Sequence, residues 1–210
     1  MRLLVGLGNP GAAYAHNRHN IGFLALDAIA ERYRLSAWRK RFQGMVAEGV
    51  VEGEKVLALK PSSYMNLSGQ SVGEALRFFK IAPEDVIVVY DEIELAPGKV
   101  RVKRGGGSAG HNGIKSIDAH ISNDYWRVRL GVGRPVGAGD VSNHVLQNFS
   151  KADLEWLGPF LEAVAKAAPL LVAGDENKFM TKVAMLMTPP ALKNQKQTDG
   201  KMPSGSTESE

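Results

Sequence analysis

Short apolar runs alternate with amphipathic segments over most of this chain of 210 residues. The run Leu3-Leu4-Val5 is continuous, partly β-branched and followed at once by glycine, which predicts a short buried strand. The run 86–90, Val-Ile-Val-Val-Tyr, is apolar throughout and predicts a central strand that is covered on both faces. Apolar residues repeat at three- and four-residue spacing over 21–33, which is typical of a helix that buries one face.

Further strands and helices follow in alternation. The segments 44–51 and 55–59 predict two strands joined by a hairpin-like turn, and the next apolar repeat predicts a helix that ends near Lys80. Polar and apolar residues alternate over 99–103 and again over 127–130. Each of these strands therefore directs its aliphatic residues to the core and its lysines and arginines to the opposite face. Strands that alternate with helices in this way predict an α/β fold.

The carboxyl-terminal part of the chain is predicted to be helical and then disordered. A capping-box-like start at 150–153 begins a helical region that Pro159 and Pro169 should interrupt or kink, and a last helix covers about 177–187. The segment 190–210 has almost no apolar content, so burial there cannot offset the entropy of ordering. We therefore expect one catalytic domain over 1–189 and a disordered polar tail over 190–210.

Composition narrows the class of protein. The hydrophobic content of 44% is ordinary for a globular domain, and the absence of cysteine excludes disulfides, thiolate zinc sites and a cysteine nucleophile. A lack of cysteine is compatible with a reducing compartment, so the cytoplasm is the default location. No apolar run reaches the roughly 20 residues of a membrane span, and the amino terminus lacks a signal-peptide pattern. We expect no membrane association.

The stretch Gly6-Leu7-Gly8-Asn9-Pro10-Gly11 matches the glycine pattern of dinucleotide-binding folds. That pattern needs a helix to open at its last glycines, so that the helix N-terminus can bind the pyrophosphate. Asn9-Pro10-Gly11 is instead typical of a turn, and helical periodicity begins only near Ile21. We therefore disfavour a dinucleotide site.

Three polar residues follow predicted strands and should share one edge of the sheet: Asn9, Asn66 and Asp91. Ligands of α/β sheets bind beyond the carboxyl ends of the strands. His19 follows Asn9 in a polar run, and a histidine paired with an aspartate can take a proton from water near neutral pH. Spacing alone favours the simpler alternative, in which His19 only caps or solvates the next helix.

Two other segments allow more than one interpretation. The acidic run 91–94 contains possible magnesium or calcium ligands, but strand alternation directs Glu92 away from Asp91, so we disfavour a metal site. The glycine-rich segment 104–113 is a flexible surface loop, a backbone nest for an anion, or a gate over a site. Its position before a helix beginning near Gly113 favours a functional role, with His111 and Asn112 as its polar contacts.

Positive charge is concentrated between Lys99 and Arg134. This segment holds eight basic and two acidic residues, whereas the whole chain carries a formal charge of only +4. The basic strands form a solvated face or a surface for phosphates, which makes nucleic acid a candidate partner. Four amides at the candidate site, which suit a substrate rich in carbonyl and amide groups, are Asn9, Asn20, Asn66 and Asn112. The residues alone thus favour a cofactor-free hydrolase with a polyanionic partner.

Five ordered blocks resemble the bacterial peptidyl-tRNA hydrolase family over about residues 1–190. The blocks are Val5–Gly11 with Tyr14 and Arg18–Gly22; Lys60-Pro61 with Tyr64–Gly69; Tyr90-Asp91; Gly110–Gly113; and Arg129–Pro135. The resemblance implies a monomeric, single-domain, three-layer α/β/α sandwich with a mixed, mainly parallel sheet. It also implies hydrolysis of the ester that joins a peptide to the 3′-terminal adenosine of tRNA, with no metal or cofactor.

The resemblance also implies a role for each matching residue. His19 would be the general base, Asp91 its partner, and Asn9 the reader of a blocked amino terminus. Asn66 and Asn112 would hold substrate and water. The crevice would be lined by Tyr14 and Tyr64, with Met65 and His111 as further substrate contacts, and the 5′-phosphate end of the acceptor stem would be bound by Lys103 and Arg129.

Two departures from the family pattern stand out. Asp91-Glu92 replaces the usual paired aspartates, and Ala109-Gly110 replaces the usual two glycines before His-Asn. A different class of function also stays open, because similar proteins in plants assist intron splicing: a non-catalytic RNA-binding relative. Intact His19, Asp91, Asn9 and Asn112 favour the enzyme.

Overall fold

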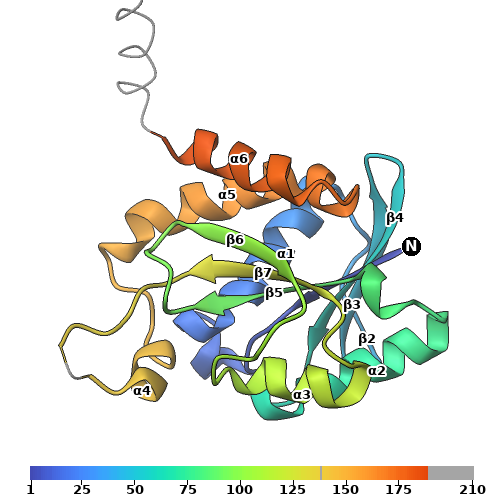
Figure 1. The fold of residues 1–210 in the computed structure, drawn as a ribbon, viewed down its shortest axis with the longest axis horizontal. Coiled ribbons are helices and arrows are strands. Elements are labelled where there is room, and N and C mark those ends of the chain that lie inside the picture. Colours follow the sequence, from blue (N-terminus) through green and yellow to red (C-terminus); the bar gives the residue numbers. More distant parts are fainter. Residues whose placement is uncertain (138, 189–210) are drawn as a thin grey trace, which may run out of the picture.

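The computed structural model describes residues 1–137 and 139–188 (Figure 1). Its centre is a seven-stranded sheet in the order β2-β3-β4-β1-β5-β7-β6. The strands are β1 (Arg2–Gly6), β2 (Arg39–Arg41), β3 (Gly44–Val51), β4 (Glu54–Pro61), β5 (Val86–Glu92), β6 (Val100–Arg104) and β7 (Trp126–Gly131). The predicted positions of the principal strands are therefore confirmed.

Parallel pairing dominates the middle of the sheet. β4, β1, β5 and β7 run parallel to one another, whereas β3 and β6 are antiparallel to their neighbours. All seven residues of β5 are buried, as expected for a continuous apolar strand with both faces covered. In Figure 1 the arrowheads of β5 and β7 lie on the same side of the molecule as the short helix α4 (Val141–Val145).

Helices cover both faces of the sheet and give the predicted three layers (Figure 1). One core joins the sheet to α1 (Ile21–Arg32), α5 (Asp153–Val172) and α6 (Glu176–Met187). A second core on the other face joins it to α2 (Ser68–Phe79) and α3 (Asn112–Ile121). The α/β/α sandwich with a mixed, mainly parallel sheet is confirmed. No helix in the described ranges is long and apolar enough to cross a membrane.

Two glycines let α1 pack directly on the sheet. A Cβ atom on Gly22 would lie 2.3 Å from the carbonyl oxygen of Val89, and one on Gly6 would lie 2.4 Å from that of Gly22. The glycine of the opening motif therefore serves helix packing rather than a nucleotide. This close approach brings the start of α1, and His19 just before it, to the end of β5.

The predicted start of α5 is confirmed, and the predicted interruption of this helix at its two prolines is wrong; the kink expected as the alternative stays a prediction. Ser150 and Asp153 exchange reciprocal side-chain to backbone hydrogen bonds of 2.8 and 3.1 Å, which is a capping box. The helix then runs unbroken through Pro159 and Pro169. Its buried apolar face supplies tertiary packing that outweighs the two missing backbone donors. The expected disordered tail at 190–210 lies outside the described residues.

Candidate active site

Polar residues from three parallel strands meet at the carboxyl edge of the sheet. Asn9 follows β1, Asn66 follows β4, and Asp91 is near the end of β5. The Asn9 side-chain oxygen accepts a hydrogen bond of 2.8 Å from the backbone N–H of Met65, which joins the first two loops. The edge predicted from strand ends therefore does collect these residues.

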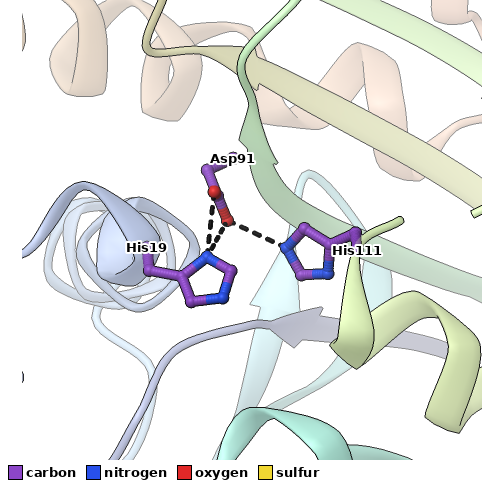
Figure 2. A group of neighbouring side chains, drawn as sticks. All are labelled: His19, Asp91 and His111. Carbon is purple, nitrogen blue, oxygen red and sulfur yellow. Dashed lines mark hydrogen bonds and ion pairs between the residues drawn. The ribbon is translucent and has the colours of Figure 1, made fainter. Parts of the chain in front are cut away.

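His19 and Asp91 form a direct pair. His19 lies in the 3-10 turn Arg18–Asn20 that precedes α1, and its Nδ1 is 2.8 and 2.9 Å from the two Asp91 carboxylate oxygens (Figure 2). Because an ionised carboxylate only accepts, Nδ1 carries the proton and Nε2 is free to accept one. The alternative, in which His19 only caps or solvates a helix, does not explain this geometry.

A second histidine contacts the same carboxylate. His111 Nε2 lies 2.9 Å from Asp91 Oδ1, and the two imidazole centroids are 4.9 Å apart (Figure 2). His111 Nδ1 accepts a weak hydrogen bond from the backbone of Ile114 at the start of α3, so the proton sits on Nε2. The link between His111 and Asp91 was not predicted, since spacing along the chain carries no signal for it.

The three groups influence one another's protonation. Burial lowers the pKa of His19, but the charge of Asp91 and its hydrogen bond outweigh burial and raise that pKa above its usual value of 6.5. Burial favours the neutral form of Asp91, yet both histidines hold the pKa of its carboxyl well below the usual range. Asp91 is therefore ionised at neutral pH and His19 is a stronger base than a free imidazole.

His19 lines two cavities. The larger, about 330 Å³, also contacts Asp91, His111 and Asn112, with residues 108–110 and α4 as walls. The smaller, about 220 Å³, is lined by Asn9, His19, Tyr64, Met65, Asn66 and Asn112 together with one end of the α4 segment. His19 and Asn112 line both, so a ligand in either cavity can reach the imidazole.

Two of the predicted site residues, Asn20 and Tyr14, line neither cavity. Asn20 is buried and exchanges hydrogen bonds of 2.9 Å with the backbone N–H and C=O of Asn9. Both the oxygen and the nitrogen of its amide bind the Asn9 backbone, so Asn20 supports the loop that carries Asn9. Tyr14 lies half-buried in the turn Ala12–Tyr14 and is not among the residues that line either cavity.

The segment that carries His19 is fastened to the start of α5. Arg18 Nη2 lies 2.7 Å from Asp153 Oδ2, and its backbone N–H donates to the carbonyl of Gln147 at 3.1 Å. Asn17 donates a side-chain hydrogen bond of 2.7 Å to Asn148. These anchors were missed because they join residues about 130 positions apart.

The basic strands divide into a surface pair and a buried arginine. Lys103 and Arg129 are diagonal neighbours on one face of β6 and β7, because Lys103 is paired with Arg127 and Arg101 with Arg129. Both side chains are partly exposed, and partial burial together with Arg129 and Arg127 lowers the pKa of Lys103. The inclusion of Arg127 in a solvated face is wrong, since it is 0% exposed beneath α3 and the glycine-rich loop.

The residues most able to hold a metal ion are His19, Asp91 and His111. They present ligand atoms that all lie within 4.8 Å of one another. Each of these atoms is already hydrogen-bonded to another member of the group, so a metal would displace both histidine–carboxylate bonds. Of the acidic run 91–94, only Asp91 belongs to this group, while Glu92 turns toward Arg129 and the backbone of Glu94.

Comparison with known proteins gives a consistent family. A family model described as peptidyl-tRNA hydrolase matches residues 3–194. A protein of that name from Rhodospirillum centenum is 55% identical over 190 residues, covering 90% of this chain and 84% of the relative. One from Mesorhizobium japonicum is 57% identical over 192 residues, covering 91% of this chain and 80% of the relative.

A solved structure agrees with the sequence relatives. The crystal structure of peptidyl-tRNA hydrolase from Acinetobacter baumannii superposes with a TM-score of 0.81 at 37% identity. The match covers 87% of this chain and 94% of that chain. The family model, the relatives and the fold agree over the part of the chain that carries the site, and the chain belongs to the peptidyl-tRNA hydrolase family.

Proposed function

We propose that this chain hydrolyses the ester bond between the peptide and the 3′-terminal ribose of tRNA in peptidyl-tRNA, with His19 as the general base. The observation that carries the proposal is the His19–Asp91 pair, which leaves Nε2 free to accept a proton on a histidine that lines both cavities. A buried carboxylate behind an imidazole is the arrangement that activates water near neutral pH. Membership of the family supports the same reaction.

The proposed reaction needs one water molecule and one proton relay. His19 Nε2 takes a proton from water as its oxygen attacks the ester carbonyl carbon, and Asp91 stabilises the imidazolium that forms. The tetrahedral intermediate then breaks the bond to the ribose oxygen. The imidazolium returns its proton to that oxygen, so a free peptide and a tRNA with an intact ribose hydroxyl result.

The amides surrounding His19 suit recognition of a peptide. Asn9 is 7% exposed, and its side-chain oxygen accepts a hydrogen bond from the backbone N–H of Met65. Its side-chain NH₂ group is left to donate to a substrate carbonyl. Asn66 and Asn112 line the smaller cavity with the exposed ring of Tyr64. We propose that these groups bind the peptide and the attacking water, and that Asn9 distinguishes blocked from free amino termini.

The tRNA portion of the substrate would contact the basic strands. Lys103 and Arg129 form a pair of partly exposed cations on adjacent strands. A phosphate group can accept hydrogen bonds from both cations, and its negative charge would offset the electrostatic repulsion between the two side chains. We assign the acceptor-stem phosphate to this pair. We also propose that the chain acts as a monomer in the cytoplasm, because one chain supplies every proposed site residue and tRNA is used there.

The non-catalytic RNA-binding alternative is not favoured. A protein that only binds RNA has no need of an ionised buried carboxylate behind a histidine, because burying a charge costs free energy. Asp91 is 4% exposed and its two hydrogen-bond partners are both histidines. This arrangement serves proton transfer better than it serves RNA binding.

Release of tRNA from N-acetyl-aminoacyl-tRNA tests the proposal. Wild-type protein should release tRNA, and His19→Ala should be slower by about 10²- to 10⁴-fold, the usual contribution of a general base. His120→Ala is a matched control, since His120 lies near the end of α3, lines neither cavity, and bonds to the backbone carbonyl of Ser116. An inactive wild type, or a His19→Ala protein as fast as wild type, contradicts the proposed mechanism.

A further inference from the structure

Arg127 is the largest fully buried side chain in the described structure. It lies on β7, and one guanidinium nitrogen donates a hydrogen bond of 2.8 Å to Asp118 Oδ1 on α3. The other terminal nitrogen donates at 2.8 Å to the backbone carbonyl of Gly107, in the glycine-rich loop. A buried cation with so few acceptors is costly to leave unpaired, so both bonds constrain the groups that accept them.

The remaining contacts hold the guanidinium in place. Its centre lies 4.8 Å from the centroid of the Tyr125 ring, and the Tyr125 hydroxyl donates to the same Asp118 oxygen at 2.8 Å. Arg127 Nε has no acceptor among the described residues. The Arg127 side chain, the Tyr125 ring and the Asp118 carboxylate therefore form one unit, and the hydrogen bond from Arg127 to Gly107 connects this unit to the glycine-rich loop.

The loop that Arg127 binds has a backbone that needs an anchor. Gly105, Gly106, Ala109 and Gly110 all have positive φ, at +68°, +94°, +48° and +84°. The left-handed conformation is unfavourable for alanine, so Ala109 does not adopt it by local preference. Gly107 lies in the middle of this run, so its bond to Arg127 fixes the loop where local preference does not.

His111 lies between the two elements that Arg127 joins. It follows the loop directly, caps α3, and is two helical turns before Asp118 on the same side of that helix. One bond of Arg127 holds the segment before His111, and the other holds the helix after it. The position of the imidazole that donates to Asp91 is thereby fixed from both sides.

We infer that Arg127 is a positioning residue, which holds His111 in hydrogen-bonding distance of Asp91 through Gly107 and Asp118. The inference rests on the proposed function. Arg127 has no part in phosphate binding, unlike Arg129 on the same strand, because it is inaccessible to a ligand. The loop is accordingly an anchored wall of the larger cavity rather than a free gate.

Arg127→Lys tests the inference, since lysine keeps the charge but cannot make two fork-like bonds to separate acceptors. We expect kcat to fall about ten- to a hundredfold, equally on N-acetyl-aminoacyl-tRNA and on a minimal adenosine ester, with little change in KM. Arg104→Lys is the matched control, because Arg104 is an exposed arginine at the end of β6 that pairs with Asp124, just before β7. A loss confined to full-length tRNA would mean phosphate binding and would overturn the inference.

Two further measurements separate positioning from a general structural role. The first is a double variant: Arg127→Lys combined with His111→Ala should lose no more activity than His111→Ala alone. The second is the pH profile, in which each single variant should move the acidic limb of kcat/KM to higher pH. The reason is that an Asp91 carboxylate that no longer accepts a hydrogen bond from His111 interacts more strongly with His19 and raises its pKa further. Multiplicative losses, or an unmoved limb, would overturn the inference. If Arg127→Lys does not fold, Tyr125→Phe removes one bond of the unit and should show the same changes at smaller size.

Proton NMR provides a measurement that is independent of activity. The His111 Nε2–H resonance, protected by its bond to Asp91, should broaden or disappear in Arg127→Lys and persist in Arg104→Lys. An inactive wild type with this pattern would contradict the proposed function and leave the positioning role intact. An unchanged resonance in folded Arg127→Lys would overturn the positioning role alone.

Discussion

One carboxylate serves two imidazoles at the centre of the site. Asp91 accepts from His19 and from His111, and its ionised form is maintained by both. The charge of Asp91 raises the pKa of His19, and this has two opposite consequences for the proposed catalysis. A raised pKa makes His19 a better base, but it also means that more of the enzyme carries a protonated, inactive imidazole at low pH.

The first prediction concerns Asp91→Asn. An asparagine removes the charge that raises the pKa of His19, while burial, which lowers it, remains. The acidic limb of kcat/KM should therefore lie above pH 6.5 in the wild type and move to lower pH in the variant. The rate on the plateau should fall by about 10³- to 10⁴-fold, because an amide can also select the wrong tautomer.

Glu92→Gln is the neighbouring control for this pH profile. Glu92 is paired with Arg129 and accepts a hydrogen bond from the backbone of Glu94, and the charge that raises the pKa of His19 is that of Asp91. The acidic limb of kcat/KM for the Glu92→Gln variant should stay at the wild-type pH. If Asp91→Asn moved the limb upward, the assigned role of the carboxylate would be wrong.

At the scale of elements, α1 determines where His19 lies. Gly22 in α1 approaches β1 and β5 so closely that a methyl group would meet the Val89 carbonyl at 2.3 Å and the Leu7 nitrogen at 2.5 Å. The turn that carries His19 immediately precedes this contact, and Arg18 fastens the same turn to Asp153. The distance between His19 and Asp91 thus depends on backbone packing as well as on side chains.

The second prediction follows from that contact. Gly22→Ala should lower the free energy of unfolding by about 3 kcal/mol, the upper part of the range for overpacked sites, and should reduce kcat by displacing His19. Thermal unfolding and kinetics on the same preparation measure both effects.

Gly158→Ala is the matched substitution on α5. A Cβ atom there meets no atom within 4 Å, so alanine should stabilise the helix by about 0.5–1 kcal/mol. Its kcat should equal that of the wild type. A Gly22→Ala protein that behaved in the same way would show that the close contact is not needed.

Over the whole molecule, the proposed catalytic pair and the basic strands lie on neighbouring parts of one sheet. β5 carries Asp91 and pairs with β7, which carries Arg129 and pairs with β6 and Lys103. The acceptor stem and the ester can therefore be bound by one continuous region. The concentration of positive charge between Lys99 and Arg134 also favours association with a polyanion.

The third prediction separates these two regions. Lys103→Ala and Arg129→Ala should each weaken tRNA binding and reduce the salt slope of log K by about 0.7–0.9, the value for one lost phosphate contact. Cleavage of a minimal adenosine ester should change much less. Binding titrations at several salt concentrations, with both substrates in kinetics, measure this. Equal losses on both substrates would place these residues in the catalytic step.

Much of the fold and part of the site follow from the sequence alone. Local periodicity is sufficient to predict the principal strands and helices. The rule that ligands bind beyond the carboxyl ends of parallel strands is sufficient to predict that Asn9, Asn66 and Asp91 lie at one edge of the sheet. The capping box at Ser150 and Asp153 is equally local. These features depend on neighbours along the chain or on a general property of sheets.

Only the tertiary structure decided which polar residues are available for chemistry. Alternation along β7 treats Arg127 and Arg129 alike, yet α3 and the glycine-rich loop cover the first and leave the second accessible. Asn20 resembles the other site amides until its bonds to Asn9 are seen, and His111 shows no relation to Asp91 along the chain. Burial and pairing depend on contacts between distant segments, and such contacts leave no local pattern.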